Sequence, residues 1–270
     1  MIFGHRGLGT DKHNPPLPEN TIDSLVKAAT LPFVSGVEFD VQMLADGNLV
    51  VYHDFDFKNK QLAELTLPDV GEFLPACEFK SLLSTLALTQ KRVICELKYP
   101  PLNSKVWRTN RSRAEMADAV VDALINSGIK DIYVSSFDPN ILVEVKKILD
   151  GFPPGRMSAC NIRVIFNCWF GHEEDGWDDH DLEDLRNRDP LTALAFAKSL
   201  AGTSDSPVLV LETAWLLRNR WFLSRARTEG VQIFTYGKGN STVFDCQNQL
   251  SLGVNCVIAD RVDTFDYTLN

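Results

Sequence analysis

The chain has 270 residues, 44% of them hydrophobic, and a formal net charge of −9. This length and hydrophobic content are enough to bury one large core, and α/β barrels of about 250 residues commonly form a single domain. The acidic balance argues against a surface that follows a nucleic-acid backbone, which needs a basic stripe, but it leaves open a phosphate ligand held by a metal and local cations.

Short β-rich runs alternate along the chain with longer runs of helical periodicity. Eight strands are predicted, at Ile2–Gly4, Val37–Gln42, Val93–Leu97, Ile132–Ser136, Arg163–Asn167, Val208–Leu211, Val231–Tyr236 and Cys256–Ala259. The helical patterns include Arg113–Asn126, Pro139–Asp150, Pro190–Ala201 and Ala214–Thr228. This alternation predicts a parallel sheet, and eight units suggest a closed TIM (β/α)8 barrel, one domain over residues 1–270, with its active site at the C-terminal ends of the strands.

The first predicted strand runs into His5-Arg6-Gly7. A histidine at a strand end is a candidate general acid or base, because its pKa lies near neutral pH. Arg6 offers a fork of N–H groups that suits phosphate or carboxylate. Gly7 allows close approach of the backbone to a ligand.

Next along the chain, Glu19-Asn20-Thr21 precedes a helical pattern that begins at Ile22. Asn20 or Thr21 is expected to cap this helix, because a short polar side chain satisfies the free N–H groups of the first turn. Glu19 lies outside the cap and is a candidate to face the site.

The second strand carries Glu38 and Asp40 two residues apart. Residues i and i+2 of a strand point to the same face, so the two carboxylates can share a metal ion, while Val37, Phe39 and Val41 form the apolar face. Two acids on a buried strand would be costly without a cation, and a salt-bridged acid pair is the alternative.

A further apolar run, Leu49–Tyr52, follows too closely for a crossover helix, and Asp46-Gly47 is a strong turn signal. A hairpin centred there pairs positions whose numbers sum to roughly 93. This register predicts that His53 returns opposite Asp40, which would place the second histidine beside the carboxylate pair.

Two segments break the alternation and are interpreted as loops: residues 58–75 and residues 151–188. The second contains an acidic run that begins at Glu173 and ends at Asp184. A run of like charges is usually a solvated loop, and a second cation site is the alternative reading.

Glu96 and Lys98 come at the end of the third predicted strand and share one face of it. Glu96 would supply a third carboxylate beside Glu38 and Asp40, a set of oxygen ligands that suits one hard divalent cation, Mg²⁺ or Ca²⁺. Lys98 would balance phosphate charge. Further on, Asp138 is expected to cap a helix, and Phe137 either walls a substrate pocket or belongs to the core.

Targeting signals and membrane spans are not visible in the sequence. The six cysteines show no C-x-x-C spacing, and Cys95 and Cys256 lie in apolar runs typical of buried reduced thiols. No apolar run approaches the ~18 residues that span a bilayer, and the chain runs from Met1 into Ile2–Gly4 without a leader-like segment. We therefore expect a cytoplasmic protein without stable membrane insertion.

Taken together, these residues resemble the glycerophosphodiester phosphodiesterase family. The family pattern reads here as His5-Arg6-Gly7, Glu19-Asn20-Thr21, Glu38-x-Asp40, His53-Asp54, Glu96-x-Lys98, Ser136-Phe137 and Gly253-Val254 with Ile258-x-Asp260. The match covers nearly the whole chain in the right order. Leu8-Gly9, Asp184–Arg188 and Leu194–Ala197 are similar to the eukaryotic cytosolic glycerophosphocholine-type branch, whereas Phe234–Gly237 departs from the Trp-Thr-x-Asn of many relatives.

The resemblance implies a barrel of the phospholipase-C-like phosphodiesterase type, with a divalent cation on Glu38, Asp40 and Glu96. It also implies acid and base roles for His5 and His53. The implied reaction is metal-dependent hydrolysis of a small glycerophosphodiester to sn-glycerol 3-phosphate and an alcohol, within glycerophospholipid degradation.

Alternatives remain at this stage. A lysophospholipase D or a cyclising phosphodiesterase would act on lysolipids, and a binding module would sense glycerophosphodiesters without turnover. The head group is also open, since a choline pocket would use aromatic faces and several aromatic residues are candidates: Tyr99, Trp107, Trp169 and Tyr236. The oligomeric state is not indicated.

Overall fold

The structure is a computed structural model that describes residues 1–10, 12, 14–71, 78–100, 108–153, 160–170, 189–202 and 205–265. Its nine-stranded sheet has the order β1-β11-β10-β9-β8-β7-β6-β2-β3 and closes because β1 also pairs with β2. Eight strands are parallel: β1 (Ile2–Gly4), β2 (Gly36–Met43), β6 (Arg92–Leu97), β7 (Asp131–Ser136), β8 (Asn161–Cys168), β9 (Val208–Glu212), β10 (Gln232–Tyr236) and β11 (Cys256–Ala259). The predicted (β/α)8 barrel is confirmed.

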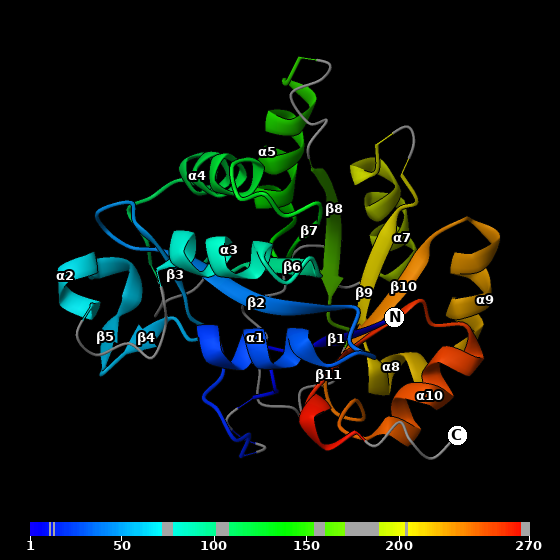
Figure 1. The fold of residues 1–270 in the computed structure, drawn as a ribbon. Helices are drawn as coiled ribbons and strands as arrows, with labels where there is room; N and C mark the ends of the chain where they lie inside the picture. Colours follow the sequence, from blue (N-terminus) through cyan, green and yellow to red (C-terminus); the bar gives the residue numbers. More distant parts are fainter. Residues whose placement is uncertain are drawn as a thin grey trace.

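Helices surround the strands on the outside of the barrel (Figure 1). They are α1 (Ile22–Thr30), α3 (Phe79–Ala87), α4 (Arg113–Ile125), α5 (Pro139–Asp150), α7 (Pro190–Leu200), α8 (Thr213–Arg218), α9 (Arg220–Thr228) and α10 (Val243–Leu252), with short 3-10 turns at Leu62–Glu64 and Val262–Thr264. Their apolar faces pack on the outward-facing residues of the strands, such as Val37, Phe39 and Val41 of β2. Thr21 caps α1, and Asp138 caps α5 as expected.

The inside of the barrel has a separate apolar layer, formed by Phe3, Ile94, Tyr133, Ile165, Val208, Val210, Phe234, Cys256 and Ile258. Side chains alternate between the two faces of a strand, so the residue two positions later faces the interior again, one layer nearer the C-terminal end. For Phe3, Ile94, Tyr133, Ile165, Val210 and Ile258 that next residue is polar: His5, Glu96, Ser135, Asn167, Glu212 and Asp260. The apolar layer therefore forms the floor of a polar site.

The hairpin after β2 exists, but its predicted register is wrong by one residue. β3 (Leu49–Val51) pairs antiparallel with β2 so that Val41 faces Val51, and the Tyr52 N–H donates to the Asp40 carbonyl at 3.1 Å. Tyr52, rather than His53, therefore lies opposite Asp40. The cause is the loop: Leu44 pairs with Asn48 across three residues, and Gly47 adopts φ +86°. A hairpin centred between Asp46 and Gly47 requires an even number of loop residues, whereas this loop has three.

Two further expectations need correction. The stretch interpreted as a loop, residues 58–75, contains β5 (Lys60–Gln61), which pairs antiparallel with β4 (Asp56–Phe57) just before it, and then α2 (Leu67–Val70). The helix predicted at Ala214–Thr228 is divided into α8 and α9 at Asn219, whose ψ of 49° ends the first helix. The acidic run 173–184 lies outside the described residues.

Candidate active site

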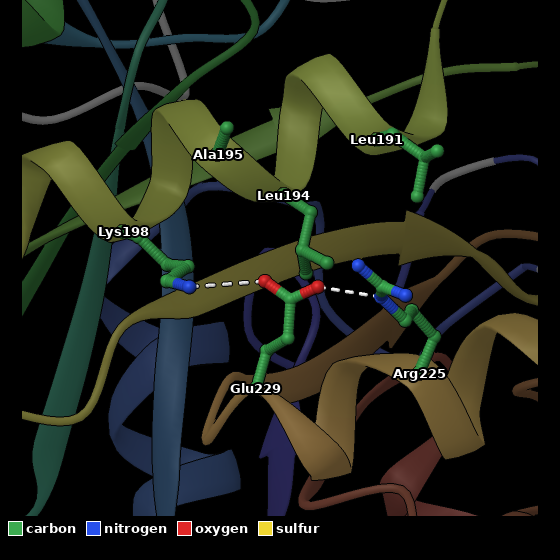
Figure 2. Close-up of a pocket in the computed structure, with 6 residues that line it drawn as sticks. All are labelled: Leu191, Leu194, Ala195, Lys198, Arg225 and Glu229. Atoms are coloured by element: carbon green, nitrogen blue, oxygen red, sulfur yellow. Dashed lines mark hydrogen bonds and ion pairs between the residues drawn. The ribbon is translucent and has the colours of Figure 1, made fainter.

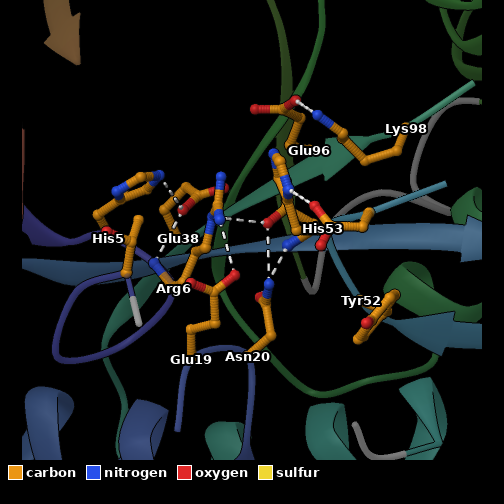
Figure 3. A network of polar contacts seen from close by, with 12 residues as sticks. His5, Arg6, Glu19, Asn20, Glu38, Tyr52, His53, Glu96 and Lys98 are labelled. Carbon is orange, nitrogen blue, oxygen red and sulfur yellow. Dashed lines mark hydrogen bonds and ion pairs between the residues drawn. The ribbon is translucent and has the colours of Figure 1, made fainter. Parts of the chain in front are cut away.

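Three carboxylates meet at the C-terminal end of the barrel. Glu38 and Asp40 lie on β2, and the register of the neighbouring strand brings Glu96 of β6 beside Asp40. One oxygen from each of the three lies within 4.8 Å of the others, and among the described residues no other group of acids, histidines and cysteines meets this criterion. Figure 3 shows Glu38 and Glu96 near the two histidines.

Burial makes this cluster electrostatically costly. Burial, reinforced by the Asp40 charge, raises the pKa of Glu38 to about 8. Burial also raises the pKa of Glu96, and Lys98 opposes the shift. Asp40 behaves differently, because Arg6 and other cations outweigh its burial and lower its pKa.

The residues present fit a hard divalent cation. The oxygen Oε1 of Glu38 is buried without a hydrogen-bond partner, a costly arrangement that a bound ion would relieve. The donors are carboxylate oxygens, the ligands that Mg²⁺ and Ca²⁺ prefer. The cluster is consistent with a divalent metal site, and the geometry does not distinguish between the two ions.

Two asparagines that the sequence did not single out for the site hold these carboxylates. Asn20 Nδ2 donates to Asp40 Oδ2 at 2.9 Å, so Asn20 serves the cluster, while the helix cap falls to Thr21. Asn167 of β8 donates from Nδ2 to Glu96 Oε2 at 3.1 Å. Asn167 follows the interior residue Ile165 by two positions, a relation that becomes visible once the closed barrel places Ile165 inside.

Arg6 contacts three carboxylates, through its side chain and its backbone. Its Nη1 donates to Glu19 Oε1 at 2.7 Å, its Nε lies 3.1 Å from Asp40 Oδ2, and its backbone N–H donates to Glu38 Oε2 at 3.0 Å. Arg6 has φ 47°, a left-handed conformation in which its side chain and its backbone both reach the cluster. Glu19 therefore faces the site, as expected, and fixes the guanidinium.

Lys98 lies on the same side of the cluster as Glu96. Its Nζ is 3.3 Å from Glu96 Oε1, and the side chain is 8% exposed. The two residues thus form a buried ion pair, which places one fixed positive charge next to the third carboxylate.

His5 projects from the end of β1. Its Nδ1 lies 2.9 Å from Asp260 Oδ1, and its Nε2 lies 3.8 Å from Glu38 Oε2. Burial lowers the pKa of His5, but the Asp260 carboxylate outweighs burial and the net shift is upward. Asp260 belongs to the Ile258-x-Asp260 part of the sequence pattern, which by itself predicts no role for the carboxylate.

His53 follows β3, and its Nδ1 lies 2.6 Å from Asp54 Oδ1. Burial and then the Lys98 charge lower the pKa of His53 to about 4, while Asp40 opposes the shift. His53 is thus within electrostatic reach of the carboxylate pair, although the pairing that predicted this was one residue out. In Figure 3 the two histidines lie on either side of Arg6.

Gln42 fixes the segment that carries His53. Its Nε2 donates to the carbonyls of Tyr52, His53 and Asp54 at 2.9, 3.2 and 2.7 Å. Gln42 is buried on the same face of β2 as Glu38 and Asp40. One strand therefore carries two metal-ligand candidates and the anchor of the second histidine.

Two aromatic rings lie at the ends of β7 and β10. Phe137 and Tyr236 make an edge-to-face contact with their centroids 5.5 Å apart. The Tyr236 hydroxyl donates to the Cys168 carbonyl at 3.0 Å, and burial raises the pKa of Tyr236 well above its usual value. Of the other head-group candidates, Tyr99 donates from its hydroxyl to the Arg111 carbonyl, Trp169 is buried, and Trp107 lies outside the described residues.

A surface hollow of about 300 Å³ lies elsewhere, between α7 and α9 (Figure 2). Leu191, Leu194, Ala195 and Lys198 line one side from α7, and Glu229 on the other side bonds to both Lys198 and Arg225. The hollow contains none of the predicted site residues. Separately, none of the helices that the structure describes is long and apolar enough to cross a membrane.

Comparisons with known proteins identify the family to which the chain is similar. The model of the Glycerophosphoryl diester phosphodiesterase family matches residues 5–264. The human Glycerophosphocholine phosphodiesterase GPCPD1 is 25% identical over 97% of this chain and 44% of its own length. The Glycerophosphocholine phosphodiesterase GDE1 of Candida albicans is 51% identical over 57 residues, 20% of this chain and 5% of that protein. The chain thus spans less than half the length of these relatives.

Solved structures share the fold. An Oleispira antarctica phosphodiesterase in complex with the product sn-glycerol-3-phosphate matches with a TM-score of 0.68 and 16% identity, covering 97% of this chain and 93% of that one. A glycerophosphodiester phosphodiesterase from Parabacteroides distasonis matches with a TM-score of 0.67 and 18% identity, covering 96% and 92%. At this identity the likeness establishes the barrel architecture.

Proposed function

The chain belongs to the Glycerophosphoryl diester phosphodiesterase family of enzymes, and we propose that it hydrolyses glycerophosphodiesters to sn-glycerol 3-phosphate and an alcohol. The observation that carries this proposal is the trio Glu38, Asp40 and Glu96, in which a buried Glu38 oxygen lacks a hydrogen-bond partner, next to two histidines. We further propose that residues 1–270 form one catalytic domain, because the family match and the barrel strands both extend over nearly the whole chain.

In this proposal Glu38, Asp40 and Glu96 hold one divalent cation, Mg²⁺ or Ca²⁺. When bound, the cation supplies charge stabilisation to the phosphoryl oxygens. Arg6 is already tied to Glu19 and Asp40, so its charge is delivered in a fixed orientation. Lys98 supplies a second fixed positive charge for the phosphate, a form of preorganisation that costs little at the moment of reaction.

His5 and His53 exchange protons with the substrate. Each ring uses Nδ1 to contact an aspartate, Asp260 for His5 and Asp54 for His53, which leaves Nε2 for proton transfer. One histidine takes a proton from the nucleophile, and the other gives a proton to the leaving alcohol. Such groups typically contribute 10²- to 10⁴-fold to a rate.

We propose choline as the preferred alcohol. The names of the human and Candida relatives support this choice, and so does the pair of rings formed by Phe137 and Tyr236. The face of an aromatic ring attracts a quaternary ammonium group. A matched pair of variants tests the choice: Tyr236→Phe keeps the ring and should retain the preference for glycerophosphocholine over glycerophosphoglycerol, whereas Tyr236→Leu should lose it.

A reducing, cytoplasmic location completes the proposal. The described cysteines are all buried, and Cys95, Cys160, Cys246 and Cys256 are free thiols. Buried reduced thiols of this kind are common in cytosolic proteins. The partner of the protein would be its small-molecule substrate.

Phosphorus NMR of glycerophosphocholine tests the reaction. We expect purified protein to release sn-glycerol 3-phosphate with Mg²⁺ or Ca²⁺, and to release none with EDTA. Glu96→Gln should lower the rate by more than about 100-fold, since losing even a group that supports a metal ligand costs 10- to 100-fold. Glu144→Gln, on the outer surface of α5, is the matched control and should leave the rate unchanged.

Two results would contradict the proposal. Turnover that survives EDTA would remove the metal from the mechanism. Release of product from a lysolipid, with no release from any water-soluble glycerophosphodiester, would replace the proposed substrate class with lysolipids.

A further inference from the structure

Asp260 and His5 are 255 positions apart in the sequence but form a direct contact. The first and last strands of the barrel pair with each other, so that Gly4 of β1 faces Ala259 of β11. His5 and Asp260 are the next residues of these two strands, and their side chains meet with Nδ1 and Oδ1 2.9 Å apart. Closure of the barrel therefore creates this pair.

The Asp260 carboxylate is itself held in place by the backbone. The Thr10 N–H donates to Asp260 Oδ1 at 3.0 Å, and the Asp260 N–H donates to the Asn240 carbonyl at 3.1 Å. Close packing adds to this: a Cβ on Gly9, whose φ is +116°, would lie 2.7 Å from the Arg261 nitrogen. With 4% of its surface exposed, Asp260 has little freedom to move.

The other histidine has a different partner. Asp54 is the next residue in the chain after His53, and its side chain is 63% exposed. A carboxylate in water can exchange its partner for solvent at low cost, whereas a buried carboxylate cannot. The ring of His5 is thus fixed by the fold to a greater extent than the ring of His53.

We propose that Asp260 is a positioning residue that sets the tautomer and the orientation of His5. An ionised carboxylate only accepts hydrogen bonds, so the neutral ring must carry its proton on Nδ1 and donate it to Asp260. The unprotonated Nε2 then faces the carboxylate cluster, where Glu38 Oε2 lies 3.8 Å away. The effect on turnover rests on the proposed function, whereas the effect on the tautomer does not.

Asp260→Asn tests this role because it keeps the size of the side chain. An amide can donate to His5 Nδ1 as well as accept from it, so the variant allows the wrong tautomer. Asp263→Asn is the matched control: it makes the same change three positions later, where the carboxylate pairs with Arg261. Both variants are first compared with the wild type by thermal unfolding and by the affinity for Mn²⁺ as a probe ion.

Two readouts separate positioning from general structural support. The first is the kinetics with glycerophosphocholine, where Asp260→Asn should lower kcat by about 10- to 100-fold, the range for a group that orients a functional side chain, and should leave KM within about threefold. The second is the ¹⁵N spectrum of the histidine rings at alkaline pH, with the His5 signals assigned by their loss in His5→Gln. The wild type and Asp263→Asn should show His5 protonated on Nδ1, and Asp260→Asn should show a mixture.

An unchanged His5 tautomer in a folded Asp260→Asn protein would overturn the inference. So would a kcat within about threefold of the wild type in a variant whose tautomer has changed. If the wild type cleaves no glycerophosphodiester but the tautomer changes in Asp260→Asn, the positioning role stands and the proposed function fails.

Discussion

At the scale of single residues, the site depends on amides that orient carboxylates. Asn20 and Asn167 each donate one hydrogen bond to a metal-ligand candidate, at 2.9 and 3.1 Å. The amide of Asn167 has a defined orientation, because its Nδ2 must face the Glu96 carboxylate for the contact to be attractive. Such supporting bonds decide how well a carboxylate is preset for a cation.

Asn167→Ala should therefore weaken cation binding with little effect on the fold. Removing the donor frees Glu96 to rotate, and we expect the affinity for the cation to fall by about tenfold. Isothermal titration with Mg²⁺ and Ca²⁺ measures this effect. Asn248→Ala makes the same change on the exposed face of α10 and should bind as the wild type does. Equal affinities in the two variants would show that Asn167 does not support the site.

At the scale of elements, β2 connects the carboxylate cluster with the segment that carries His53. Glu38 and Asp40 point into the barrel, and Gln42 on the same face holds the carbonyls around His53. The antiparallel β3 returns the chain to this point, so a hairpin inserted into an otherwise parallel barrel delivers the second histidine.

Gln42→Met should separate the support of the His53 segment from the placement of the carboxylates on β2. Methionine fills a similar volume to glutamine but has no amide. The three carbonyls lose a shared donor, so the His53 segment should loosen while β2 keeps its carboxylates. We expect kcat to fall by about tenfold and stability to fall by about 1–2 kcal/mol, with unchanged cation affinity. Gln247→Met on exposed α10 is the control. A loss of cation affinity equal to the loss of kcat would mean that Gln42 supports the carboxylates instead.

The outer helices should affect stability without affecting the chemistry. Ser112 caps α4 by accepting from the Glu115 N–H, and Glu115 accepts in return from the Ser112 N–H at 2.7 Å. Ser112→Ala should lower the free energy of unfolding by about 1 kcal/mol, the usual cost of losing such a cap. Urea unfolding measures this change, and kcat should stay the same. A substantial change in kcat would show that α4 is coupled to the site.

Much of this arrangement could be predicted from the sequence, because strand alternation and the spacing of Glu38 and Asp40 are local patterns. The hairpin register was missed by one residue because it depends on whether the loop has two or three residues, and both are compatible with Asp46-Gly47. Asn167 and Asp260 were missed for another reason. Each follows an interior apolar residue by two positions, but which strand faces lie inside the barrel becomes clear only when the sheet closes.

At the scale of the whole molecule, burying acids in the barrel mouth couples stability to pH and to cation binding. In the metal-free protein Glu38 has a pKa of about 8 against an ordinary value of 4.5, so between these values the folded state holds a proton that the unfolded state has released. Its contribution to stability is therefore lost as pH rises toward 8. The raised pKa of His5 acts in the same direction above its ordinary value of 6.5.

The lowered pKa of His53 has the opposite effect on the pH dependence of stability, but over a lower pH range. Its pKa of about 4 lies below the ordinary 6.5, so its contribution rises with pH between these values and is constant above them. Below pH 6.5 the effects of His53 and Glu38 oppose each other. Above pH 6.5 both Glu38 and His5 make the metal-free protein less stable, which leaves a window from pH 6.5 to about 8 for a clear test.

We therefore expect the Tm of the protein in EDTA to fall across this window, and the Tm increase on adding Mg²⁺ or Ca²⁺ to grow, because the cation competes with the protons held by the site. Thermal unfolding followed by circular dichroism at several pH values measures both trends. Glu38→Gln is the control: it cannot ionise, so its Tm in EDTA should depend less on pH, and the cation should raise it less. A wild-type Tm in EDTA that stays level or rises from pH 6.5 to 8 would mean that Glu38 and His5 do not retain protons in the folded protein over this pH range.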